Sequence, residues 1–592
     1  MTTRATRTPR RRTVIALAAI LLILGGFVFR LVDIQVVSAD DRVAESLKYL
    51  GDSTSIQGQR GTIVDENGAV LAQSVTVYDF NMDPKAMNAV ETNEDVPPKL
   101  PWAEASTKIA EIMGIDADEL RAGVAAARDK NPDTQWYQLA QGLDTRQYTE
   151  LADLKLVYLH AEPRQTRVYP NGAVAGNIIG FLNGSGEAQA GIEQMEAQCL
   201  TPINGAETYR IGTNGVIIPG SEQSTDAVDG GTVQLTINSD LNWYLQQMIA
   251  EEAQAQGAQG GTVTVVEVNT GKIRAAAEWP TVDPNNLDGS SPSTWYSKLF
   301  TYAFEPGSTF KPITAAAIME NGGVTPTSPT VSASSKEHFP NGAVINDAFL
   351  HPTYNYTLAG ALIDSSNVAL SKFGTMVSPD VRYDYLQRFG VGSETVGFPS
   401  EAAGELHPTS EWDNQSLYTT TFGQHFTVTA PQVAGAYQAI ANGGEKIELS
   451  LIESCTDADG TVHKSAEPDK AQIIEPQTAA DLTRMLENVA VQGGNAERIK
   501  VPGYRITSKT GTAQIPDGHG GYKAGVYYTS MVGFAPADDP QYVVIVTLDQ
   551  PTRITSSAAT ASAFQKAVTQ VMKTYRVMPS TVPMDALLPK FD

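Results

Sequence analysis

The 592-residue sequence predicts a membrane-anchored protein of the mixed α/β (α+β) class, with more than one domain. Three observations carry this prediction. An uncharged apolar run lies near the start of the chain, strands are expected at both ends of the long region after residue 230, and helices fill its middle. Hydrophobic residues make up 42% of the chain and charged residues 18%, a composition typical of globular proteins.

The first expected element is a single membrane-spanning helix. Five arginines within residues 1–12 precede an apolar run that starts at Thr13 and approaches the roughly 20 residues needed to cross a bilayer. Because basic flanks stay in the cytoplasm, we expect a cytoplasmic tail over 1–12, a transmembrane helix over 13–32 and all later residues outside the cytoplasm. The alternative is a cleaved signal peptide with its cleavage site at Val37-Ser38-Ala39, but the long run and the distant site favour an uncleaved anchor.

Residues 33–229 are expected to form an elongated pedestal domain. The mixed, amphipathic stretch over 33–57 suggests a stalk. Asn67-Gly68 between apolar segments is a strong hairpin signal, and residues 101–159 are largely helical in composition. Nothing in this region combines a nucleophile, a base and a pocket, so we interpret it as structural.

Residues 230–592 are expected to form the second domain. Alternation at Val233, Leu235 and Ile237 predicts a strand, and residues 240–255 an amphipathic helix. Strands at the start, helices in the middle, then strands and a closing helix indicate one antiparallel sheet built from both ends of the domain. The further expected elements are strands over 262–268, 272–277, 505–514, 527–535 and 542–549, and helices over 357–373, 429–442 and 556–575.

Charge and motif content argue against several function classes. The formal charge of −24 argues against a nucleic-acid partner, because phosphate binding needs a basic face. The sequence has no H-E-x-x-H motif, no C-x-x-C motif and no glycine-rich phosphate loop, so we expect no metal site. The two cysteines, Cys199 and Cys455, are either buried free thiols or, in an oxidising compartment, a single disulfide. We favour free thiols because the two residues lie in different predicted domains.

The candidate nucleophile lies in the stretch Glu305–Pro312. Pro306-Gly307 forms a turn before an Ala-rich helix former, which places Ser308 at a helix start and Lys311 one turn later on the same face. A hydroxyl becomes nucleophilic when a base takes its proton, and an amine that burial keeps neutral can be that base. An isolated S-x-x-K is more often a helix cap followed by a solvated lysine. Here it is the only S-x-x-K in the chain, and two more motifs follow it.

The second motif is Ser365-Ser366-Asn367, the only S-x-N in the chain. Its Ser365 hydroxyl can relay a proton, and the Asn367 amide can hold a lysine and a peptide backbone. By itself it would be an ordinary Ser/Asn cluster at a helix end.

The third motif is Lys509-Thr510-Gly511-Thr512, the only K-T-G in the chain. Gly511 leaves room for close approach, and an extended edge there can bind a peptide by strand addition. Lys509 and the Thr510 hydroxyl suit a carboxylate partner. By itself the motif would be a hairpin strand with an exposed lysine.

In this order, the three motifs resemble those of the class B penicillin-binding proteins, the monofunctional peptidoglycan D,D-transpeptidases. The resemblance extends over nearly the whole chain. Further matching residues are Arg60-Gly61, Asp65 and Asn67-Gly68; Arg167, Tyr169-Pro170 and Gly191-Ile192-Glu193; Trp279-Pro280 and Asp283-Pro284-Asn285; Phe398-Pro399; Phe422-Gly423-Gln424; and Val428-Thr429-Ala430-Pro431-Gln432. It implies a transpeptidase domain with the fold of penicillin-binding proteins and serine β-lactamases.

The resemblance also implies residue roles. Ser308 attacks the penultimate D-Ala carbonyl of a stem peptide, Lys311 is the base, and Ser365 and Asn367 support proton transfer and substrate orientation.

Binding of the substrate is assigned to the third motif. Lys509 and Thr510 recognise the terminal carboxylate, Gly511 leaves room for the close approach of the substrate, and the backbone N–H groups of Ser308 and Thr512 form the oxyanion hole. An amine of a second stem peptide then resolves the ester. β-Lactam antibiotics acylate the same serine, and no metal or organic cofactor is needed.

Two positions depart from the family pattern. His425 stands where the family usually has Gly, and Ser508 stands where a small residue such as Gly often precedes the lysine. Neither removes a catalytic group, and we expect His425 to be a solvated loop histidine.

The resemblance leaves the biological role open between several alternatives. Because the sequence carries no glycosyltransferase domain, we expect a membrane glycosyltransferase partner of the FtsW/RodA type. We favour an FtsI-like division role, with an elongation role as the alternative. A D,D-carboxypeptidase or β-lactamase-like hydrolase would share the scaffold but needs neither anchor nor pedestal. An inactive scaffold or β-lactam sensor is disfavoured because every catalytic side chain is retained.

Overall fold

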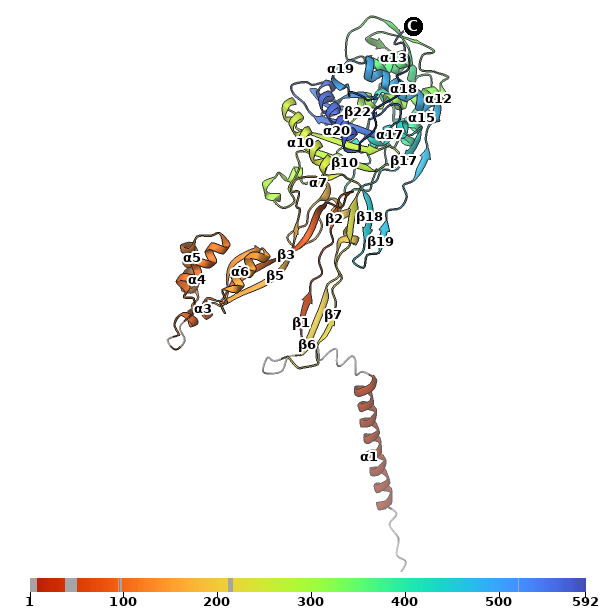
Figure 1. The fold of residues 1–592 in the computed structure, drawn as a ribbon. Helices are drawn as coiled ribbons and strands as arrows, with labels where there is room; N and C mark the ends of the chain where they lie inside the picture. The colour runs from red at the N-terminus through yellow and green to blue at the C-terminus, as the bar shows by residue number, and fades with distance from the viewer. Residues whose placement is uncertain (1–7, 38–50, 94, 96–97, 211–216, 520) are drawn as a thin grey trace, which may run out of the picture. The chain divides into compact units, whose positions relative to one another are not determined.

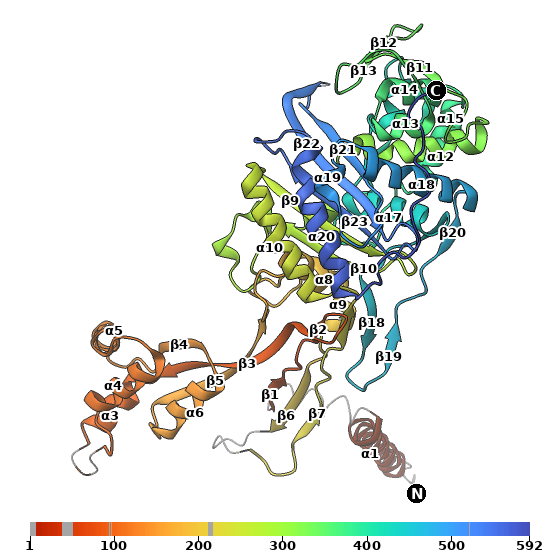
Figure 2. The same ribbon diagram turned by 45° about the horizontal axis from the view of Figure 1, so that its top comes forward.

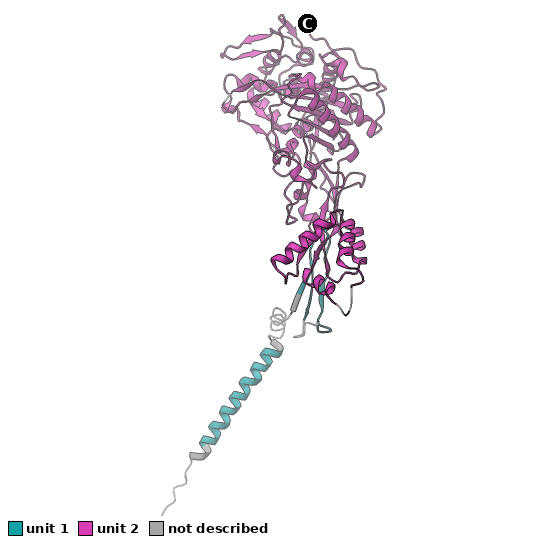
Figure 3. Ribbon diagram, turned by 90° about the vertical axis from the view of Figure 1, so that its left-hand side faces the viewer, with its two compact units in different colours: residues 1–59, 202–229 teal, residues 60–201, 230–592 magenta. Residues whose placement is uncertain are grey.

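The computed structural model describes residues 8–37, 51–93, 95, 98–210, 217–519 and 521–592. The chain divides into two compact units, residues 1–59 with 202–229 and residues 60–201 with 230–592 (Figure 3). Most of the expected cytoplasmic tail, and residues 38–50 of the expected stalk, lie outside the described residues.

The first unit contains one long apolar helix and a small sheet. Helix α1 (Thr8–Val32) is exposed along its apolar length and is long and apolar enough to span a membrane, as predicted. A π-helical turn (Asp33–Val37) follows it. The sheet joins β1 (Gly51–Ile56), β6 (Gly205–Arg210) and β7 (Gln223–Thr225) in antiparallel order, so the part of the expected stalk described after residue 50 is mainly a strand.

A seven-stranded sheet in the second unit combines strands from both sides of residue 230. The predicted hairpin at Asn67-Gly68 is confirmed by the antiparallel pair β2 (Ile63–Val64) and β3 (Val70–Met82). Asp65 Oδ1 closes its turn by accepting the N–H groups of Asn67 and Ala69, each at 2.8 Å. The other strands are β4 (Tyr137–Leu143), β5 (Leu159–Val168), β8 (Thr232–Leu235), β18 (Ile452–Thr456) and β19 (Val462–Lys464).

The predicted helical part of the pedestal packs on β3, β4 and β5 around its own apolar core. Strand β4 interrupts this largely helical region. The helices are α3 (Pro84–Glu91), α4 (Trp102–Met113), α5 (Ala117–Lys130) and α6 (Thr145–Asp153), and three short ones follow β5: α7 (Gly176–Ile179), α8 (Gly191–Met195) and α9 (Ala197–Leu200).

One buried carboxylate joins three of the pedestal motifs. Glu193 has a fully buried side chain and accepts Arg60 Nε at 2.7 Å and Arg167 Nε at 2.6 Å. Arg167 Nη1 also donates to the Gly61 carbonyl at 2.5 Å. A buried carboxylate is stable only when such partners compensate for its lost hydration, so these residues fix one another's positions.

A five-stranded antiparallel sheet forms the centre of the second unit, in the order β10-β9-β23-β22-β21 (Figure 2). This confirms the predicted sheet built from both ends of the region after residue 230. The strands are β9 (Gly260–Glu267), β10 (Ile273–Trp279), β21 (Lys509–Pro516), β22 (Tyr522–Ala535) and β23 (Tyr542–Asp549). The expected strand over 505–514 starts later, because Ser508 N bonds to the Leu486 carbonyl of a neighbouring helix.

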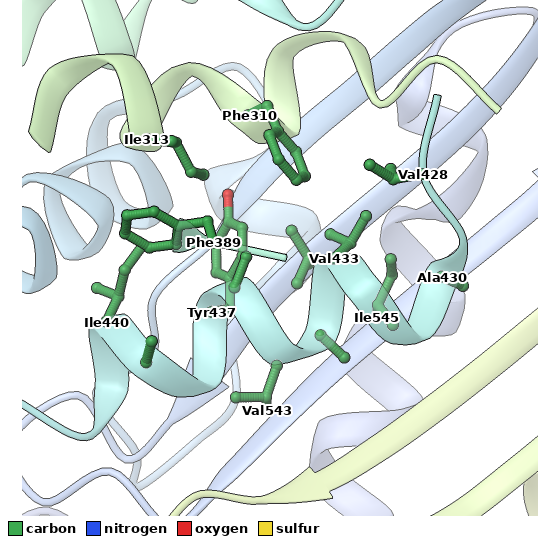
Figure 4. Packing of buried hydrophobic residues seen from close by; sticks show 14 of the residues in the cluster. Phe310, Ile313, Phe389, Val428, Ala430, Val433, Tyr437, Ile440, Val543 and Ile545 are labelled. Carbon is green, nitrogen blue, oxygen red and sulfur yellow. The ribbon is translucent and has the colours of Figure 1, made fainter. Parts of the chain in front are cut away.

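Helices cover both faces of this sheet, which explains why β23 reads as a continuous apolar run. Its Val544 and Val546 pack toward α10 (Ser239–Gln256) and α20 (Ala561–Thr574). Its Val543 and Ile545 pack toward α17 (Ala430–Ala441) on the other face (Figure 4).

Helix α17 connects the sheet to the segment that carries the candidate nucleophile. Figure 4 shows Val433 and Tyr437 on α17 below Phe310 and Ile313. The Tyr437 hydroxyl donates to the Thr309 carbonyl at 2.8 Å. Burial raises the pKa of Tyr437 well above its ordinary value, so this hydroxyl stays a hydrogen-bond donor.

A smaller group of elements lies beside the sheet. Its strands pair as β11 (Val331–Ala333) with β14 (Tyr354–Tyr356) and as β12 (Lys336–His338) with β13 (Val344–Asn346). Its helices are α12 (Lys311–Asn321), α13 (Leu358–Ile363), α14 (Asn367–Gly374), α15 (Pro379–Arg388) and α18 (Pro476–Gln492). The predicted helix over 357–373 is therefore two helices separated by the second motif.

The expectation of two free thiols is wrong. Cys199, in α9, and Cys455, in β18, form a disulfide with a Cα–Cα distance of 6.2 Å. The Cys199 carbonyl accepts Gly231 N at 2.8 Å, next to β8, and β8 pairs with β18. The sequence separation of 256 concealed this, because β18 returns from the far part of the chain to the sheet that holds β2 and β3.

Removal of the disulfide is expected to destabilise the protein. The variant Cys199→Ser/Cys455→Ser should lose about 2–5 kcal/mol of unfolding free energy, because the unfolded chain gains conformational freedom. Thermal unfolding of protein isolated without reductant measures this. Dithiothreitol should lower the melting temperature of the wild type and leave the double variant unchanged. Two titratable thiols in unreduced, denatured wild type would contradict the assignment.

Candidate active site

The candidate nucleophile lies in a tight turn at the start of α12. Ser308 is half-buried within the 3₁₀ turn η4 (Gly307–Phe310), and Lys311 begins the α-helix directly after it, as predicted. Gly307 has a positive φ of 56° and donates its N–H to the Gly423 carbonyl at 2.8 Å. A Cβ on Gly423 would lie 2.0 Å from the Gly307 carbonyl oxygen, so only glycine allows this approach.

The second motif lies between α13 and α14. Ser365 has a φ of 56°, a conformation that costs a non-glycine residue energy and that occurs often at functional sites. Ser366 caps α14, because its Oγ accepts Ala369 N at 2.9 Å. Asn367 is the first residue of α14.

The third motif starts β21, an edge strand of the central sheet. Lys509 and Gly511 are buried, Thr510 is half-buried and Thr512 is exposed. A Cβ on Gly511 would lie 2.4 Å from Ser530 Oγ and 2.9 Å from the Pro306 carbonyl oxygen. The absence of a side chain at Gly511 therefore lets β21 lie against the turn that carries the candidate nucleophile.

Hydrogen bonds between side chains connect four of the eight predicted site residues. Lys311 Nζ donates to the Ser365 carbonyl, to Ser365 Oγ at 3.2 Å and to Asn367 Oδ1 at 2.7 Å. Lys509 Nζ donates to Ser365 Oγ at 2.9 Å. Both lysine side chains are fully buried, so neither matches the solvated or exposed lysine typical of an isolated motif.

The other predicted residues border this network. Ser308 is one helical turn from Lys311, and a Cβ on its neighbour Gly307 would lie 3.6 Å from the Thr512 carbonyl oxygen. Thr512 Oγ1 accepts Ser557 N at 3.0 Å. The three motifs, spread over about two hundred residues of sequence, therefore meet where β21, η4 and the α13–α14 junction adjoin.

Two family models match this chain. The penicillin binding protein transpeptidase domain matches residues 261–573, and the penicillin-binding protein dimerisation domain matches residues 55–235. This chain belongs to the class B penicillin-binding proteins.

Similar proteins cover nearly the whole chain. Penicillin-binding protein PbpB of Mycolicibacterium smegmatis is 33% identical over 573 residues, 93% of this chain and 87% of the relative. Peptidoglycan D,D-transpeptidase FtsI of Escherichia coli is 28% identical, over 95% of this chain and 92% of the relative. The crystal structure of penicillin binding protein 3 from Mycobacterium tuberculosis, complexed with ampicillin, is 25% identical with a TM-score of 0.70, covering 91% of this chain and all of that chain.

Burial controls the charge of both lysines in this penicillin-binding protein. Burial and the neighbouring Lys509 ammonium hold the pKa of Lys311 well below the ordinary lysine value, and the Asp347 carboxylate partly opposes them. Burial lowers the pKa of Lys509 to about 7. The site therefore places an amine whose neutral form is favoured by burial within one helical turn of a hydroxyl.

A buried carboxylate on the other side of the nucleophile turn had no assigned role in the sequence. Glu305 Oε1 accepts the His425 backbone N–H at 3.0 Å, and the Tyr522 hydroxyl donates to both carboxylate oxygens at 3.0 and 3.1 Å. Burial raises the pKa of Glu305, and these hydrogen bonds oppose the shift. The contacts attach the start of β22 to the turn that holds Ser308.

His425 is exposed, as expected for a loop histidine. Its φ of 67° explains why glycine suits this position in the family. Its Nδ1 lies 2.8 Å from Thr419 Oγ1.

Sequence reasoning also missed Asp347, which contacts the second motif, and His351, which contacts Asp347. Asp347 Oδ2 accepts Ser366 Oγ at 2.7 Å and lies 2.8 Å from His351 Nε2. The only local signal is their spacing of four residues in a loop, which by itself is common. The residues that donate hydrogen bonds to Asp347 from the second motif and α14 lie 19 to 21 residues later in the sequence, and only folding brings them together.

Proposed function

We propose that this protein is a peptidoglycan D,D-transpeptidase that cross-links stem peptides through an acyl-enzyme at Ser308. The observation that carries the proposal is the shared hydrogen-bond network of Lys311, Ser365, Asn367 and Lys509, one turn from Ser308. The Escherichia coli relative is named a peptidoglycan D,D-transpeptidase, and the Mycobacterium tuberculosis structural relative is complexed with ampicillin, which supports the same chemistry here.

The first half-reaction forms the acyl-enzyme. Neutral Lys311 accepts the proton of Ser308 Oγ as that oxygen attacks the penultimate D-Ala carbonyl. The backbone N–H groups of Ser308 and Thr512 stabilise the oxyanion that develops. The C–N bond to the terminal D-Ala then breaks, and the Ser365 hydroxyl, which accepts hydrogen bonds from both lysines, delivers the proton to the leaving amine.

Substrate recognition is assigned to β21. Among the described residues no strand pairs with its outer side, and a stem peptide can add there by main-chain hydrogen bonds. Lys509 and Thr510 bind the terminal carboxylate, and Asn367 orients the peptide backbone. Gly511 keeps the strand close to Ser308.

The second half-reaction transfers the acyl group to an amine of a neighbouring stem peptide. Lys311 removes a proton from that amine, the amine attacks the ester carbonyl, and Ser308 Oγ leaves with a proton. A β-lactam antibiotic would acylate Ser308 by opening its amide ring in the same way, and the proposed steps invoke no metal or organic cofactor.

The proposal includes a location and a partner. Helix α1 anchors the chain with residues 1–12 in the cytoplasm and residues 33–229 as a pedestal that holds the catalytic domain, residues 230–592, on the cell-wall side. Glycan polymerisation then comes from a membrane glycosyltransferase of the FtsW/RodA type. The FtsI name of a relative that aligns over 95% of this chain favours a role in septal synthesis during division.

The nucleophile assignment predicts that one residue is labelled by penicillin. Intact-protein mass spectrometry should show one fluorescent penicillin added to the wild type and none to Ser308→Ala, because the alanine has no hydroxyl to acylate. Ser334→Ala, in the outer loop of the same domain, should be labelled like the wild type. Labelling that survives Ser308→Ala would refute the assignment.

The two-lysine arrangement predicts a specific pH dependence. Because Lys311 must be neutral to act as base, the rate of penicillin acylation should rise with pH through the Lys311 pKa. Lys509→Met removes the charge that lowers this pKa, so the pKa rises. The midpoint of the acid limb, the part of the pH profile where the acylation rate rises with pH, then moves to higher pH. Rates measured from pH 5 to 10 test this.

The control is Lys446→Met. Burial also lowers the pKa of Lys446, which lies elsewhere in the same domain, so its loss should leave the midpoint in place. A midpoint that stays fixed or falls in Lys509→Met would show that the two amines are not coupled as described.

The division role predicts a location in the cell. A fluorescent fusion that complements loss of the protein should concentrate at the division septum, since a septal enzyme works where the new wall forms. A Ser308→Ala fusion tests whether this depends on acylation. Uniform signal along the lateral wall, with none at septa, would favour the elongation role instead.

A further inference from the structure

The buried carboxylate of Asp347 supports the active site through hydrogen bonds to the start of α14, the helix that carries Asn367. The Asp347 side chain is 1% exposed and follows β13. Its Oδ1 accepts Asn367 N at 2.5 Å and Val368 N at 2.9 Å, and its Oδ2 accepts Ser366 Oγ at 2.7 Å. Ser366 already caps the helix, so Asp347 adds a separate constraint on where α14 begins.

This constraint fixes the orientation of the Asn367 amide. Asn367 Nδ2 donates to the Asn346 carbonyl at 3.0 Å, the residue directly before Asp347. A carbonyl only accepts, so the amide nitrogen must face Asn346 and the amide oxygen must face Lys311. The 2.7 Å bond from Lys311 Nζ to Asn367 Oδ1 depends on that orientation.

His351 holds Asp347 in turn. Its side chain is 4% exposed, its Nε2 lies 2.8 Å from Asp347 Oδ2, and its Nδ1 lies 2.7 Å from the Pro352 carbonyl oxygen. Both partners accept hydrogen bonds, so a ring nitrogen that carries a hydrogen can donate to either of them. Removal of His351 takes one hydrogen-bond partner from the buried Asp347 carboxylate.

Aromatic rings connect His351 to the far end of the sequence. The imidazole stacks on Tyr354 at 5.5 Å and meets Tyr356 edge-on at 5.8 Å. Phe591 stacks on the same Tyr354 at 4.3 Å and meets Tyr356 at 4.9 Å. Figures 1 and 2 place the C-terminus beside α13, which leads to the second motif.

Lys590 also contacts α13 and its two flanking residues directly. Thr357 N donates to the Lys590 carbonyl at 3.0 Å, and Lys590 Nζ pairs at 2.6 Å with Asp364, the residue before Ser365. A Cβ on Gly360 would lie 1.9 Å from the Lys590 carbonyl oxygen, so Lys590 lies directly on the helix.

We propose that Asp347 and His351 are positioning residues for acyl transfer, which hold Asn367 and Ser365 against Lys311. Phe591 supports Asp347 and His351 through its contacts with Tyr354 and Tyr356. Neither Asp347 nor His351 touches the reacting atoms, so both act through the second motif. The inference rests on the proposed function, because it concerns the geometry of the same acylation step.

The charge of Asp347 supplies a second expected effect. The charged or titratable groups described around the site include Lys311, Lys509, His351, Tyr354, Tyr356, Asp364 and Lys590. Asp347 favours the charged form of Lys311, so its loss lowers the Lys311 pKa and moves the acid limb of acylation to lower pH. A purely structural role would not move the limb in this direction.

The test measures penicillin acylation of the full-length protein in detergent, with non-covalent affinity and acylation rate constant determined separately. Asp347→Asn should lower the acylation rate constant by about 10- to 100-fold, because a small misplacement of a catalytic group strongly reduces the rate. The non-covalent affinity should change less than about threefold, and the acid limb should move to lower pH.

Conservative and remote variants separate positioning from loss of folding. His351→Gln keeps one donor toward Asp347 and should retain more activity than His351→Ala. Phe591→Ala should give a smaller loss, and combining it with His351→Ala should add little, because both act through one contact chain. The matched control is His463→Gln, which breaks an exposed pair of His463 with Asp457 at 2.7 Å and should acylate at the wild-type rate.

The outcomes distinguish this inference from the proposed function. If the wild type acylates at Ser308 and the variants Asp347→Asn and His351→Ala acylate at the wild-type rate, the positioning role alone is refuted. The positioning role would also be refuted if the loss of acylation rate in each variant equals its unfolded fraction in thermal melts and the acid limb of the pH profile does not move. Wild type that fails to acylate would refute the proposed function and this inference together.

Discussion

Two buried lysines that donate to one hydroxyl, Ser365 Oγ, form the interaction on which the site depends. Burying an ammonium group is costly unless partners replace its hydration, and two neighbouring ammonium groups also repel each other. The structure compensates Lys311 with the Ser365 carbonyl, Ser365 Oγ and Asn367 Oδ1, and places the Phe422 ring 6.0 Å from its Nζ. The part of the burial cost and of the repulsion from Lys509 that these contacts do not offset lowers the pKa of Lys311. A lowered pKa is the property that a lysine needs to act as a general base.

This arrangement requires backbones to approach closely in three places. Gly423 lies against Gly307, Gly511 lies against Pro306 and Ser530, and Gly360 lies against Lys590. Each contact excludes a side chain at the glycine, and together they bring the sheet edge, the nucleophile turn and the second motif into one site. The central sheet, buried on both faces, gives these contacts a rigid support.

Much of the fold followed from local patterns. Alternation, hairpin turns and apolar runs predicted β9, β10 and β23 closely, because these elements record burial directly in their residues. The start of β21 was placed too early, because Ser508 N bonds to the Leu486 carbonyl of α18 and not to a neighbouring strand. The disulfide was missed for a related reason. Nothing near Cys199 or Cys455 indicates that β18 joins a sheet with β8 and β2.

The sequence by itself determined the chemistry available, since the order of Ser308, Lys311, Ser365, Asn367 and the Lys509 motif named the reactive groups and their family. The tertiary structure alone decided how those groups are charged and held. The burial of both lysines, the Glu305 contact with Tyr522, and the support of Asn367 by Asp347 and His351 all join residues far apart in the chain. Electrostatic environment depends on distances in space, and no local pattern in a sequence records those distances.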